Sequence, residues 1–358
     1  MRVLFHCRPS FELFPGGDAI QIRKTKTALE ALGVEVYITT SPSPNPSGYD
    51  LIHIFNPLLV SMSGARRARQ LGIPVYISTI YWPMEQYFRA YLPLAKLYLK
   101  EKPPGWSAYS GEAWLRYIGY TYLWNRYMQR RLSQFISLAD VLLPNSQAEA
   151  ERLLEQFRPQ AIITAIKNGV ELGQANRSAH VPHTLSKLNQ YILCVGRLEL
   201  RKNQHLLIEA LKNSSLPLVF VGNMTASRGY LALCEQLGRE RGQTYFISHI
   251  AHELMPEVFR RARLHVMPSW YETPGLASLE AAALGVPIIT TDKGGTREYF
   301  KNEATYCQPG SLSSLKNALH EMLSKKIDPN RLGERLRSQF TWQNTAAETL
   351  AAYRASTH

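Results

Sequence analysis

The sequence predicts an α/β protein with two parallel-sheet domains, each doubly wound by helices. Short apolar runs alternate with helical segments along nearly the whole chain, as in repeated strand–helix–strand units. A polar stretch at residues 172–189, which contains Gly, Gln, Asn, Ser, Pro and His, interrupts this alternation and predicts a linker. We therefore expect a first domain over residues 1–175, a second over residues 186–340 and a terminal helix over residues 341–358.

Length and composition limit the class of protein. A chain of 358 residues is long enough for two domains with good cores, and no apolar run approaches the roughly 20 residues that cross a bilayer. The first residues predict a strand rather than a signal peptide. The four cysteines have no paired spacing, which argues against a disulfide framework or a zinc site and favours a cytoplasmic protein. The net charge of +13 indicates an anionic partner: a phosphate ligand, a membrane surface or a nucleic acid.

The first domain begins with a strand at residues 2–6, a glycine-containing turn and a helix from about Ile20 to Leu32. Gly16 and Gly17 lie in that turn, and a plain tight turn is one interpretation of the pair. The sequence lacks a Gly-x-Gly-x-x-Gly motif, so we expect no dinucleotide site. Further strands are expected near residues 50–55, 75–79 and 138–143, and Asn145-Ser146 predicts the cap of a helix over 147–157.

Residues 81–131 differ in composition from the rest of the first domain. They contain 14 aromatic residues, and eight Lys or Arg against three Glu, which leaves a net charge of +5. Two helices are expected here, over about 84–99 and 112–133. The stretch has two interpretations: a helical excursion whose aromatics shape a substrate pocket, or basic aromatic helices that dock on an anionic membrane.

The second domain is expected to continue the alternation. Strands are expected over 191–195, 218–221 and 245–247, and helices over 204–212, 229–241 and 252–261. The stretch from Pro268 to Phe300 organises this domain: a buried strand ends before it, a helix follows from about Leu276 to Leu284, and a second buried strand follows over 286–291. After it we expect a short strand at 304–307, a helix near 312–324 and a last helix over about 342–354.

Two carboxylates stand where an open α/β sheet binds its ligands. Glu272 lies in the loop after the strand, and Glu280 lies about one turn inside the helix. Helix-end N–H groups at this place favour an anion such as phosphate, which a carboxylate would repel. Both carboxylates are explained if each accepts hydrogen bonds from sugar hydroxyls beside that phosphate. By spacing alone, a solvated loop residue and a helix-surface residue remain the alternative.

Two cations provide the complementary signal. Arg197 directly follows the strand at 191–195, and Lys202 is expected at the start of the next helix. Both would therefore converge at one end of the sheet, where a diphosphate could bind. Two surface cations are the alternative, which fits Lys202 less well because a helix N-terminus disfavours positive charge.

These motifs together resemble the retaining family 4 glycosyltransferases (glycosyl transferases group 1) of GT-B fold. The resemblance rests on Glu272-x7-Glu280 around Pro274-Gly275 and on the loop Gly294-Gly295-Thr296-Arg297-Glu298. It covers nearly the whole chain. The family often carries a His after the strand at 75–79; this sequence has Tyr81 nearby as a candidate replacement, so the acceptor-side contacts stay open.

The resemblance implies a role for each motif. Glu272, Arg197 and Lys202 would be catalytic, with the two cations stabilising the departing nucleoside diphosphate. Glu280 would hold the ribose, and the Gly-Gly loop would approach the diphosphate and the transferred sugar. The substrate-binding set implied is Gly16, Gly17, Arg197, Lys202, Glu272, Pro274, Gly275, Leu276, Ala277 and Glu280. The terminal helix would pack back on the first domain.

No paired-aspartate motif is present, so we expect neither a metal nor a cofactor, and stabilisation of the leaving group by cations and helix-end N–H groups. The expected reaction moves a hexosyl-type sugar from a UDP-, GDP- or ADP-sugar to a glycan or lipid-linked acceptor, with retention of configuration, as in polysaccharide biosynthesis. We expect the protein in the cytoplasm, with peripheral binding at the inner face of the membrane as an open alternative.

Two rival functions remain at this stage. Another nucleotide-sugar enzyme of the same fold, such as an epimerase, would share the donor site. A non-enzymatic binder of nucleic acid or another polyanion would explain the charge. The net charge is +7 before residue 181 (20 basic, 13 acidic) and +6 after it (21 basic, 15 acidic). Because the positive charge is spread evenly and not concentrated in a basic arm, we do not expect a nucleic-acid partner.

Overall fold

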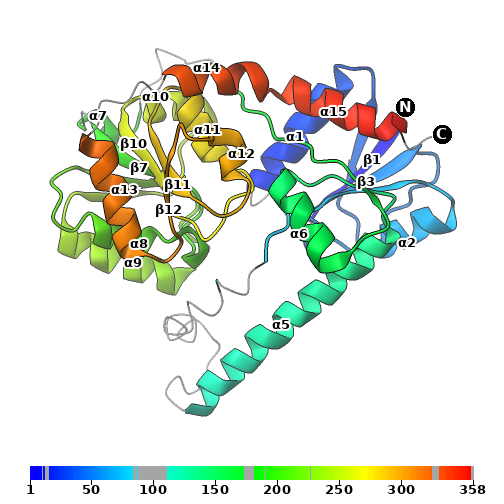
Figure 1. The fold of residues 1–358 in the computed structure, drawn as a ribbon, viewed down its shortest axis with the longest axis horizontal. Coiled ribbons are helices and arrows are strands. Elements are labelled where there is room, and N and C mark those ends of the chain that lie inside the picture. Colours follow the sequence, from blue (N-terminus) through cyan, green and yellow to red (C-terminus); the bar gives the residue numbers. More distant parts are fainter. Residues whose placement is uncertain are drawn as a thin grey trace. The chain divides into compact units, whose positions relative to one another are not determined.

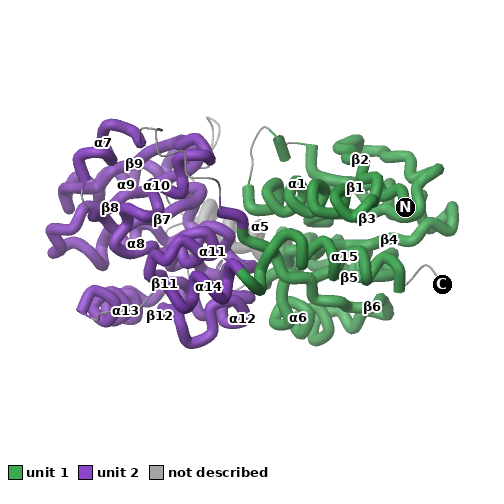
Figure 2. Tube along the Cα trace, turned by 90° about the horizontal axis from the view of Figure 1, so that it is seen from above, with its two compact units in different colours: residues 1–83, 123–170, 338–358 green, residues 84–122, 171–337 purple. Residues whose placement is uncertain are grey.

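The chain forms two compact α/β units (Figure 2). The computed structural model describes residues 1–9, 11–12, 16–83, 87, 111–172, 181–188, 190–225, 227–324 and 330–355, with backbone alone for 111–122. The first unit contains residues 1–83, 123–170 and 338–358, and the second contains residues 84–122 and 171–337. The last segment of the chain thus belongs to the first unit.

A six-stranded parallel sheet forms the centre of the first unit (Figure 1). Its strands follow in the order β2-β1-β3-β4-β5-β6 (Figure 2). Helices cover both faces, and β3 and β4 are accordingly buried at every residue. The strands are β1 (Arg2–His6), β2 (Glu35–Thr39), β3 (Leu51–Phe55), β4 (Val75–Ser78), β5 (Val141–Leu142) and β6 (Ile162–Ile163).

Two apolar clusters, one on each face, hold the helices of the first unit to this sheet. One cluster joins β1 and β2 to α1 (Gly17–Glu30) and α15 (Trp342–Ala355). The other joins the sheet to α2 (Ser63–Gln70), α6 (Gln147–Phe157) and the last turns of α5 (Gly111–Leu138). A short 3-10 turn, η1 (Pro57–Leu59), follows β3.

The terminal helix packs back on the first sheet, as expected from the sequence. The Tyr353 hydroxyl and His53 Nδ1 form a hydrogen bond of 2.6 Å, and His53 Nε2 lies 2.9 Å from the Ser78 hydroxyl. The Tyr76 hydroxyl donates to the Tyr353 carbonyl at 3.1 Å. Burial lowers the pKa of His53 to about 3, so this imidazole is neutral at physiological pH. A buried, uncharged chain of hydrogen bonds therefore fastens α15 to β3 and β4.

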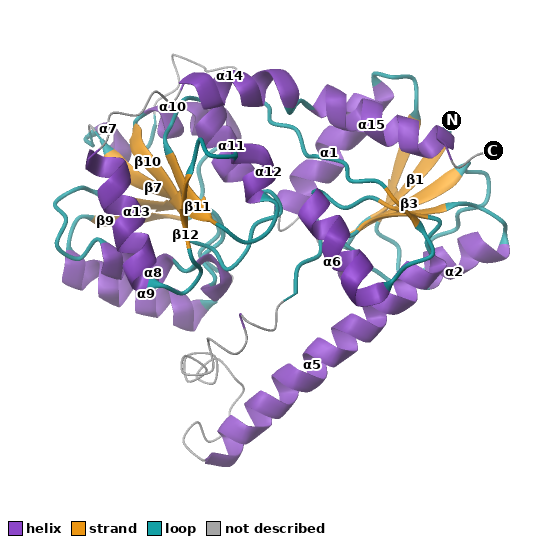
Figure 3. Cartoon of the chain, viewed as in Figure 1, coloured by secondary structure: helices purple, strands orange, loops and turns teal. Residues whose placement is uncertain are grey.

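The second unit repeats the architecture with the strand order β12-β11-β10-β7-β8-β9. Its helices α8 (Gln204–Ala210), α9 (Arg228–Arg241) and α13 (Leu312–Ser324) pack on one face, and α10 (Met255–Arg260), α11 (Leu276–Ala283) and α12 (Thr296–Phe300) lie on the other (Figure 3). The strands are β7 (Tyr191–Val195), β8 (Leu218–Val221), β9 (Thr244–Ile247), β10 (Ala262–Met267), β11 (Ile288–Thr291) and β12 (Thr305–Cys307). Shorter elements are α7 (His183–Ser186), η3 (Leu200–Lys202), η4 (His252–Leu254) and α14 (Asn330–Gln339).

Three local expectations differ from the structure, and a fourth lies outside the described residues. Helix α1 begins at Gly17, so Asp18 lies in its first turn. The helix expected over 252–261 is a 3-10 turn followed by α10, because Pro256 lies at the start of α10 and supplies no N–H to an earlier turn. Helix α14 was not expected, and the helix expected over about 84–99 lies outside the described residues. Within the described part of the chain, no helix combines the length and apolar character needed to span a bilayer.

Replacing Tyr353 by Phe is expected to loosen α15. The change leaves His53 Nδ1 buried without its partner, which costs about 1–3 kcal/mol. Amide hydrogen exchange of residues 342–355 should be faster, while that of the second unit stays unchanged. Tyr37→Phe is the matched control, because its hydroxyl is exposed and bonds only at 3.3 Å to Glu35. Equal exchange in both variants would contradict the proposed fastening.

Candidate functional site

The carboxyl ends of β7 and β10 mark the point where the strand order of the second sheet reverses. The chain runs from β7 outward through β8 and β9, then returns to β10 on the other side of β7. Loops that leave such neighbouring parallel strands diverge and leave a crevice in which open α/β sheets bind ligands. Here the loops are residues 196–203 after β7 and residues 268–275 after β10.

Three hydrogen bonds to backbone carbonyls join these two loops. The Trp270 N–H donates to the Arg201 carbonyl at 2.8 Å, and Arg201 Nη1 donates to the Tyr271 carbonyl at 3.0 Å. The buried Asn203 side chain donates through Nδ2 to the Pro268 carbonyl at 2.7 Å. The backbone on both sides of the crevice is therefore fixed before any ligand binds.

A third loop, after β11, holds the backbone of Glu272. The Glu272 N–H donates to the Lys293 carbonyl at 3.2 Å, and the Gly295 N–H donates to the Glu272 carbonyl at 3.0 Å. Gly294 lies between them with φ +96°, and a Cβ there would be 2.0 Å from the Glu272 carbonyl oxygen. Only glycine fits at position 294, because any Cβ there would overlap the Glu272 carbonyl.

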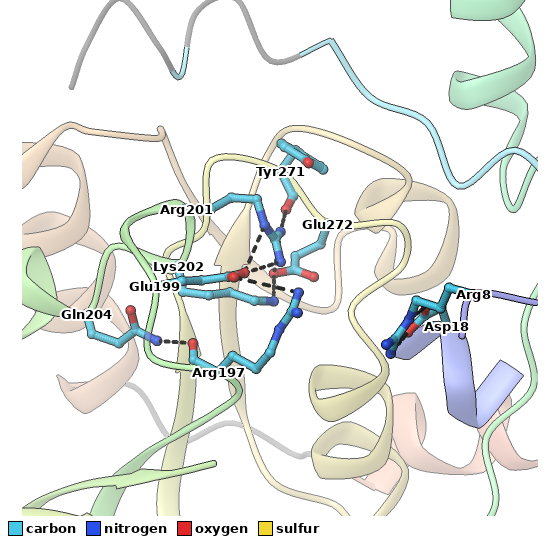
Figure 4. A network of polar contacts seen from close by, with 9 residues as sticks. All are labelled: Arg8, Asp18, Arg197, Glu199, Arg201, Lys202, Gln204, Tyr271 and Glu272. Carbon is cyan, nitrogen blue, oxygen red and sulfur yellow. Dashed lines mark hydrogen bonds and ion pairs between the residues drawn. The ribbon is translucent and has the colours of Figure 1, made fainter. Parts of the chain in front are cut away.

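The central contact of the site is a buried ion pair (Figure 4). Lys202 Nζ donates to Glu272 Oε1 at 2.5 Å, and the two side chains are only 12% and 6% exposed. Lys202 lies in η3 rather than at the start of α8, because Asn203 adopts a left-handed conformation between them. The sequence predicts Lys202 at the start of that helix, whereas it lies two residues before the first residue of α8.

Two arginines and a second carboxylate surround this pair. Arg201 donates to Glu199 Oε1 through Nε at 3.1 Å and through Nη2 at 2.8 Å, and its Nη1 lies 3.9 Å from Glu272 Oε1. Arg197 lies 3.6 Å from Glu199 and is 48% exposed, so its guanidinium can reach a ligand. We call Arg197, Glu199, Arg201, Lys202 and Glu272 the charge cluster.

The cluster keeps both of its carboxyl groups ionised. Burial alone would raise the pKa of Glu272, but the charges of Lys202 and Arg201 outweigh it and lower that pKa below its ordinary value. Burial also opposes ionisation of Glu199, and Arg201 and Arg197 likewise lower its pKa. Three cations and two carboxylates leave one surplus positive charge, which suits an anionic ligand.

The loop–helix segment that follows Glu272 contains the remaining candidates of this domain. Gly275 caps α11 with φ +88°, and Leu276 and Ala277 open the helix, where backbone N–H groups have no earlier carbonyl to bind. Pro274 is buried, and Glu280 is partly exposed in the fifth position of α11. The structure thus places both carboxylates of the motif on one loop–helix segment, as the sequence predicts.

The candidates of the first domain lie at the start of α1. Gly16 is the N-cap in an extended conformation, and Gly17 opens the helix. Asp18 follows in the first turn, where Arg8 Nε donates to its carboxylate at 2.6 Å. A Cβ on Gly16 would lie 2.9 Å from the Asp18 carboxylate, so the glycine leaves room for this ion pair.

Tyr81 is not placed as a ligand-facing replacement for the missing histidine. It is only 7% exposed, its hydroxyl donates to Gln156 at 2.6 Å, and its ring packs against Phe157 at 5.6 Å between centroids. Its N–H donates to the buried Glu149 carboxylate at 2.7 Å. Tyr81 is a core residue because its ring completes the apolar cluster beneath α6.

Comparison with known proteins identifies the second domain. Residues 177–339 match the family described as glycosyl transferases group 1. The chain carries a group 1 glycosyltransferase domain. It is also 31% identical over 236 residues to the glycogen synthase of Mycobacterium tuberculosis, which is 63% of this chain and 56% of that protein.

The group 1 glycosyltransferase domain has further relatives. The O-antigen chain mannosyltransferase B of Escherichia coli is 25% identical over 246 residues, covering 64% of each chain. This chain spans less than two thirds of the length of either curated relative.

Solved structures show that the whole chain has the GT-B fold. Sucrose-phosphate synthase from Thermosynechococcus elongatus superposes with a TM-score of 0.71 at 18% identity, over 99% of both chains. The Anabaena protein HepE, solved in complex with UDP and glucose, superposes with a TM-score of 0.69 at 19% identity, over 98% of this chain and all of that chain.

Sequence reasoning missed three residues of the glycosyltransferase domain's charge cluster and its support. Arg201 and Glu199 were given no role, and Gly294 was recognised only as part of a motif. Arg201 could have been noticed because it is next to Lys202 in the sequence. Two successive basic residues do not, however, show which of them faces a ligand. The signal for Glu199 was a lone acidic residue among three basic ones.

Replacing Gly294 by Ala is expected to disrupt the Glu272 loop of the glycosyltransferase domain. The matched control is Gly285→Ala, since Gly285 also has positive φ (+78°) but an added Cβ there would meet only the Asn330 side chain, at an ordinary contact distance of 3.6 Å. The control should lose about 1–2 kcal/mol from left-handed strain alone. Gly294→Ala should lose clearly more, because its Cβ would overlap the Glu272 carbonyl. Urea unfolding of the two variants measures the difference, and equal losses would contradict it.

Proposed function

We propose that this protein transfers a sugar from a nucleotide-sugar donor to an acceptor hydroxyl, with retention of anomeric configuration and without a metal. The observation that carries the proposal is the charge cluster at the switch point of the second sheet. Its cations suit a diphosphate and its buried carboxylate suits sugar hydroxyls. The group 1 match, the similarity to a glycogen synthase and the fold shared with a protein solved with UDP and glucose support a nucleotide sugar as donor.

The cations would act on the leaving group. When the bond from the sugar C1 to the diphosphate oxygen breaks, the electron pair leaves with the diphosphate. Arg197, half exposed beside the crevice, and Lys202 would stabilise this charge. The N–H groups at the start of α11 would add to the stabilisation. This assignment replaces the divalent ion that many other transferases use for the same purpose.

The two carboxylates would position the donor. Glu272 is held from three loops and would accept hydrogen bonds from hydroxyls of the transferred sugar. Glu280, one turn into α11, would accept hydrogen bonds from the ribose of the nucleotide. Charge-assisted hydrogen bonds of this kind are stronger and more directional than neutral ones, so they fix the sugar ring relative to the diphosphate.

The acceptor would attack from the face that the diphosphate leaves. A new bond forms between the acceptor oxygen and C1, and the acceptor proton passes to the departing phosphate oxygen. This route needs no dedicated base and retains the anomeric configuration. Gly16 and Gly17 of the first domain would allow its backbone to approach the donor. A glycan or lipid-linked glycan is the acceptor class we propose.

The test is a screen of UDP-, GDP- and ADP-sugars for binding and slow hydrolysis in the presence of a strong chelator. The parent protein should hydrolyse one donor class with EDTA present. Lys202→Gln should lower the rate by roughly a hundredfold or more, as for other lost charge contacts to a transition state. Glu280→Ala should weaken nucleotide binding by about 1.5–3 kcal/mol. Lys212→Gln is the control, because Lys212 is exposed in the same domain and 3.9 Å from Glu209.

Each element of the proposal has its own contrary result. Loss of activity in EDTA that manganese or magnesium restores would contradict the metal-free mechanism. An epimerised donor among the products would favour a nucleotide-sugar epimerase. Equal rates of donor hydrolysis by Lys202→Gln and Lys212→Gln would contradict the role of Lys202 in stabilising the leaving group. Absence of binding to every nucleotide sugar would overturn the proposed function.

We also propose that the protein binds peripherally to an anionic membrane through α5, at the cytoplasmic face. Leu123, Trp124 and Tyr127 are 65%, 40% and 51% exposed, and Arg126 and Arg130 are exposed beside them. Tyr and Trp with adjacent Arg are typical of surfaces that settle at lipid headgroups. Arg131 is excluded from this surface, because it donates to the Val60 carbonyl and lies over the Phe135 ring.

Co-sedimentation with vesicles tests this surface. Changing Arg126 and Arg130 to Ser should weaken binding to anionic vesicles about thirtyfold, at about 1 kcal/mol for each basic residue. Changing Arg66 and Arg67 of α2 to Ser removes the same charge elsewhere and should have a smaller effect. Binding should fall at 1 M salt, where screening shortens to about 3 Å. Equal sedimentation of the two double variants would contradict docking through α5.

A further inference from the structure

Lys202 and Glu272 are bound to each other although the proposed function requires both to hold a substrate. Their contact of 2.5 Å is the shortest in the charge cluster. A nucleoside diphosphate carries more than one negative charge and therefore attracts the Lys202 ammonium more strongly than one carboxylate does. When Lys202 turns to the diphosphate, Glu272 loses its nearest cation. A carboxylate that is 6% exposed and unpaired would take up a proton or leave its position.

Arg201 is the next cation to Glu272, and it cannot follow Lys202 to the ligand. Its Nη1 lies 3.9 Å from the same Oε1 that Lys202 contacts. Glu199 binds its Nε and Nη2, the Tyr271 carbonyl accepts from its Nη1, and its guanidinium lies 5.0 Å from the centre of the Tyr271 ring. A guanidinium bound along both edges stays in place, whereas a lysine on a flexible stem can turn.

We infer that Arg201 is the positioning residue of this site: it keeps Glu272 ionised and its loop in place while Lys202 binds the diphosphate. This inference rests on the proposed function and deepens it. Arg201 does not touch the donor. It acts through Glu272 and through the backbone of residues 270 and 271, to which it is bound by its own carbonyl and side chain.

The other titratable groups near Glu272 cannot replace Arg201. Cys194 on β7 and His265 on β10 are both buried beneath it. Burial raises the pKa of Cys194 to about 12 and lowers the pKa of His265 to about 3, so both are neutral between pH 5 and 8. Tyr271 is also neutral, since burial raises its pKa, and Glu199 is itself an anion. Lys202 and Arg201 are therefore the cations that lower the pKa of Glu272.

The consequence is a change in proton uptake when the nucleotide binds. In the parent protein Arg201 holds the pKa of Glu272 low after Lys202 has turned away. Without Arg201 that pKa rises, and Glu272 takes up a proton as the diphosphate binds. The ionised form that holds the sugar is then lost as the pH falls through the raised pKa, so activity disappears at a higher pH than in the parent.

The experiment uses the full chain and isothermal titration with UDP, or with GDP or ADP if the parent prefers them, in buffers of different ionisation enthalpy. Arg201→Gln should take up an extra fraction of a proton on binding near pH 5, and its affinity relative to the parent should fall as the pH rises from about 5 to 7. The acid limb of donor hydrolysis should move up by about one pH unit, with KM for the donor within about threefold of the parent. Arg201→Lys should show only part of this shift of the acid limb, because lysine keeps the positive charge.

Arg261→Gln is the control, since Arg261 forms a 2.8 Å ion pair with Glu257 away from the cluster and should leave the pH dependence unchanged. If Arg201→Gln does not fold, Arg201→Lys replaces it, because an ammonium cannot bind along both edges as the guanidinium does, and it should produce a smaller shift of the same sign.

The outcomes separate this inference from the proposed function. A parent protein that binds no nucleotide overturns both. If the parent binds, a loss of affinity by Arg201→Gln that is equal at every pH shows direct contact with the nucleotide and overturns the positioning role. Unchanged proton uptake and an unchanged acid limb in Arg201→Gln overturn it as well.

Discussion

The ion pair between Lys202 and Glu272 is the interaction on which the second domain's site depends. A carboxylate that is 6% exposed is unstable without a charged partner, so burial of Glu272 requires cations from a neighbouring element. The parallel sheet meets this requirement, because β7 and β10 end side by side and direct their loops from one edge. Asn203, Trp270 and Gly294 then fix the three loops around the pair through backbone hydrogen bonds and a close backbone approach.

Two kinds of buried polar network serve different purposes in this chain. In the first unit the chain of His53, Tyr353 and Ser78 is uncharged and fully hydrogen-bonded, which stabilises the packing of α15. In the second unit the charge cluster keeps one surplus cation at a crevice. A neutral network has little to offer an anion, whereas surplus charge held in place attracts a diphosphate without reorganisation on binding.

Periodicity and turn residues were sufficient to predict most of the fold. Apolar runs bounded by Gly and Pro located the strands of both sheets, and the Ala-rich segment after Gly275 located α11. Helix α14 was not predicted, because its buried face consists only of Leu332, Gly333 and Leu336. These are too few apolar residues to give a recognisable helical periodicity. Lys202 was placed at a helix start because a left-handed Asn203 between η3 and α8 has no distinct sequence signal.

The sequence by itself determined the alternation of elements, the position of the loop after each strand, and therefore which charged residues stand at the edge of the second sheet. Those features are local, since they follow from residue type and spacing along the chain. The tertiary structure alone decided that Lys202 pairs with Glu272 and that Arg201, bound to Glu199 in its own loop, also lies 3.9 Å from Glu272. It also decided that Tyr81 is a core residue. Pairing depends on which loops a parallel sheet brings together across 70 residues of sequence, and no local pattern records that distance.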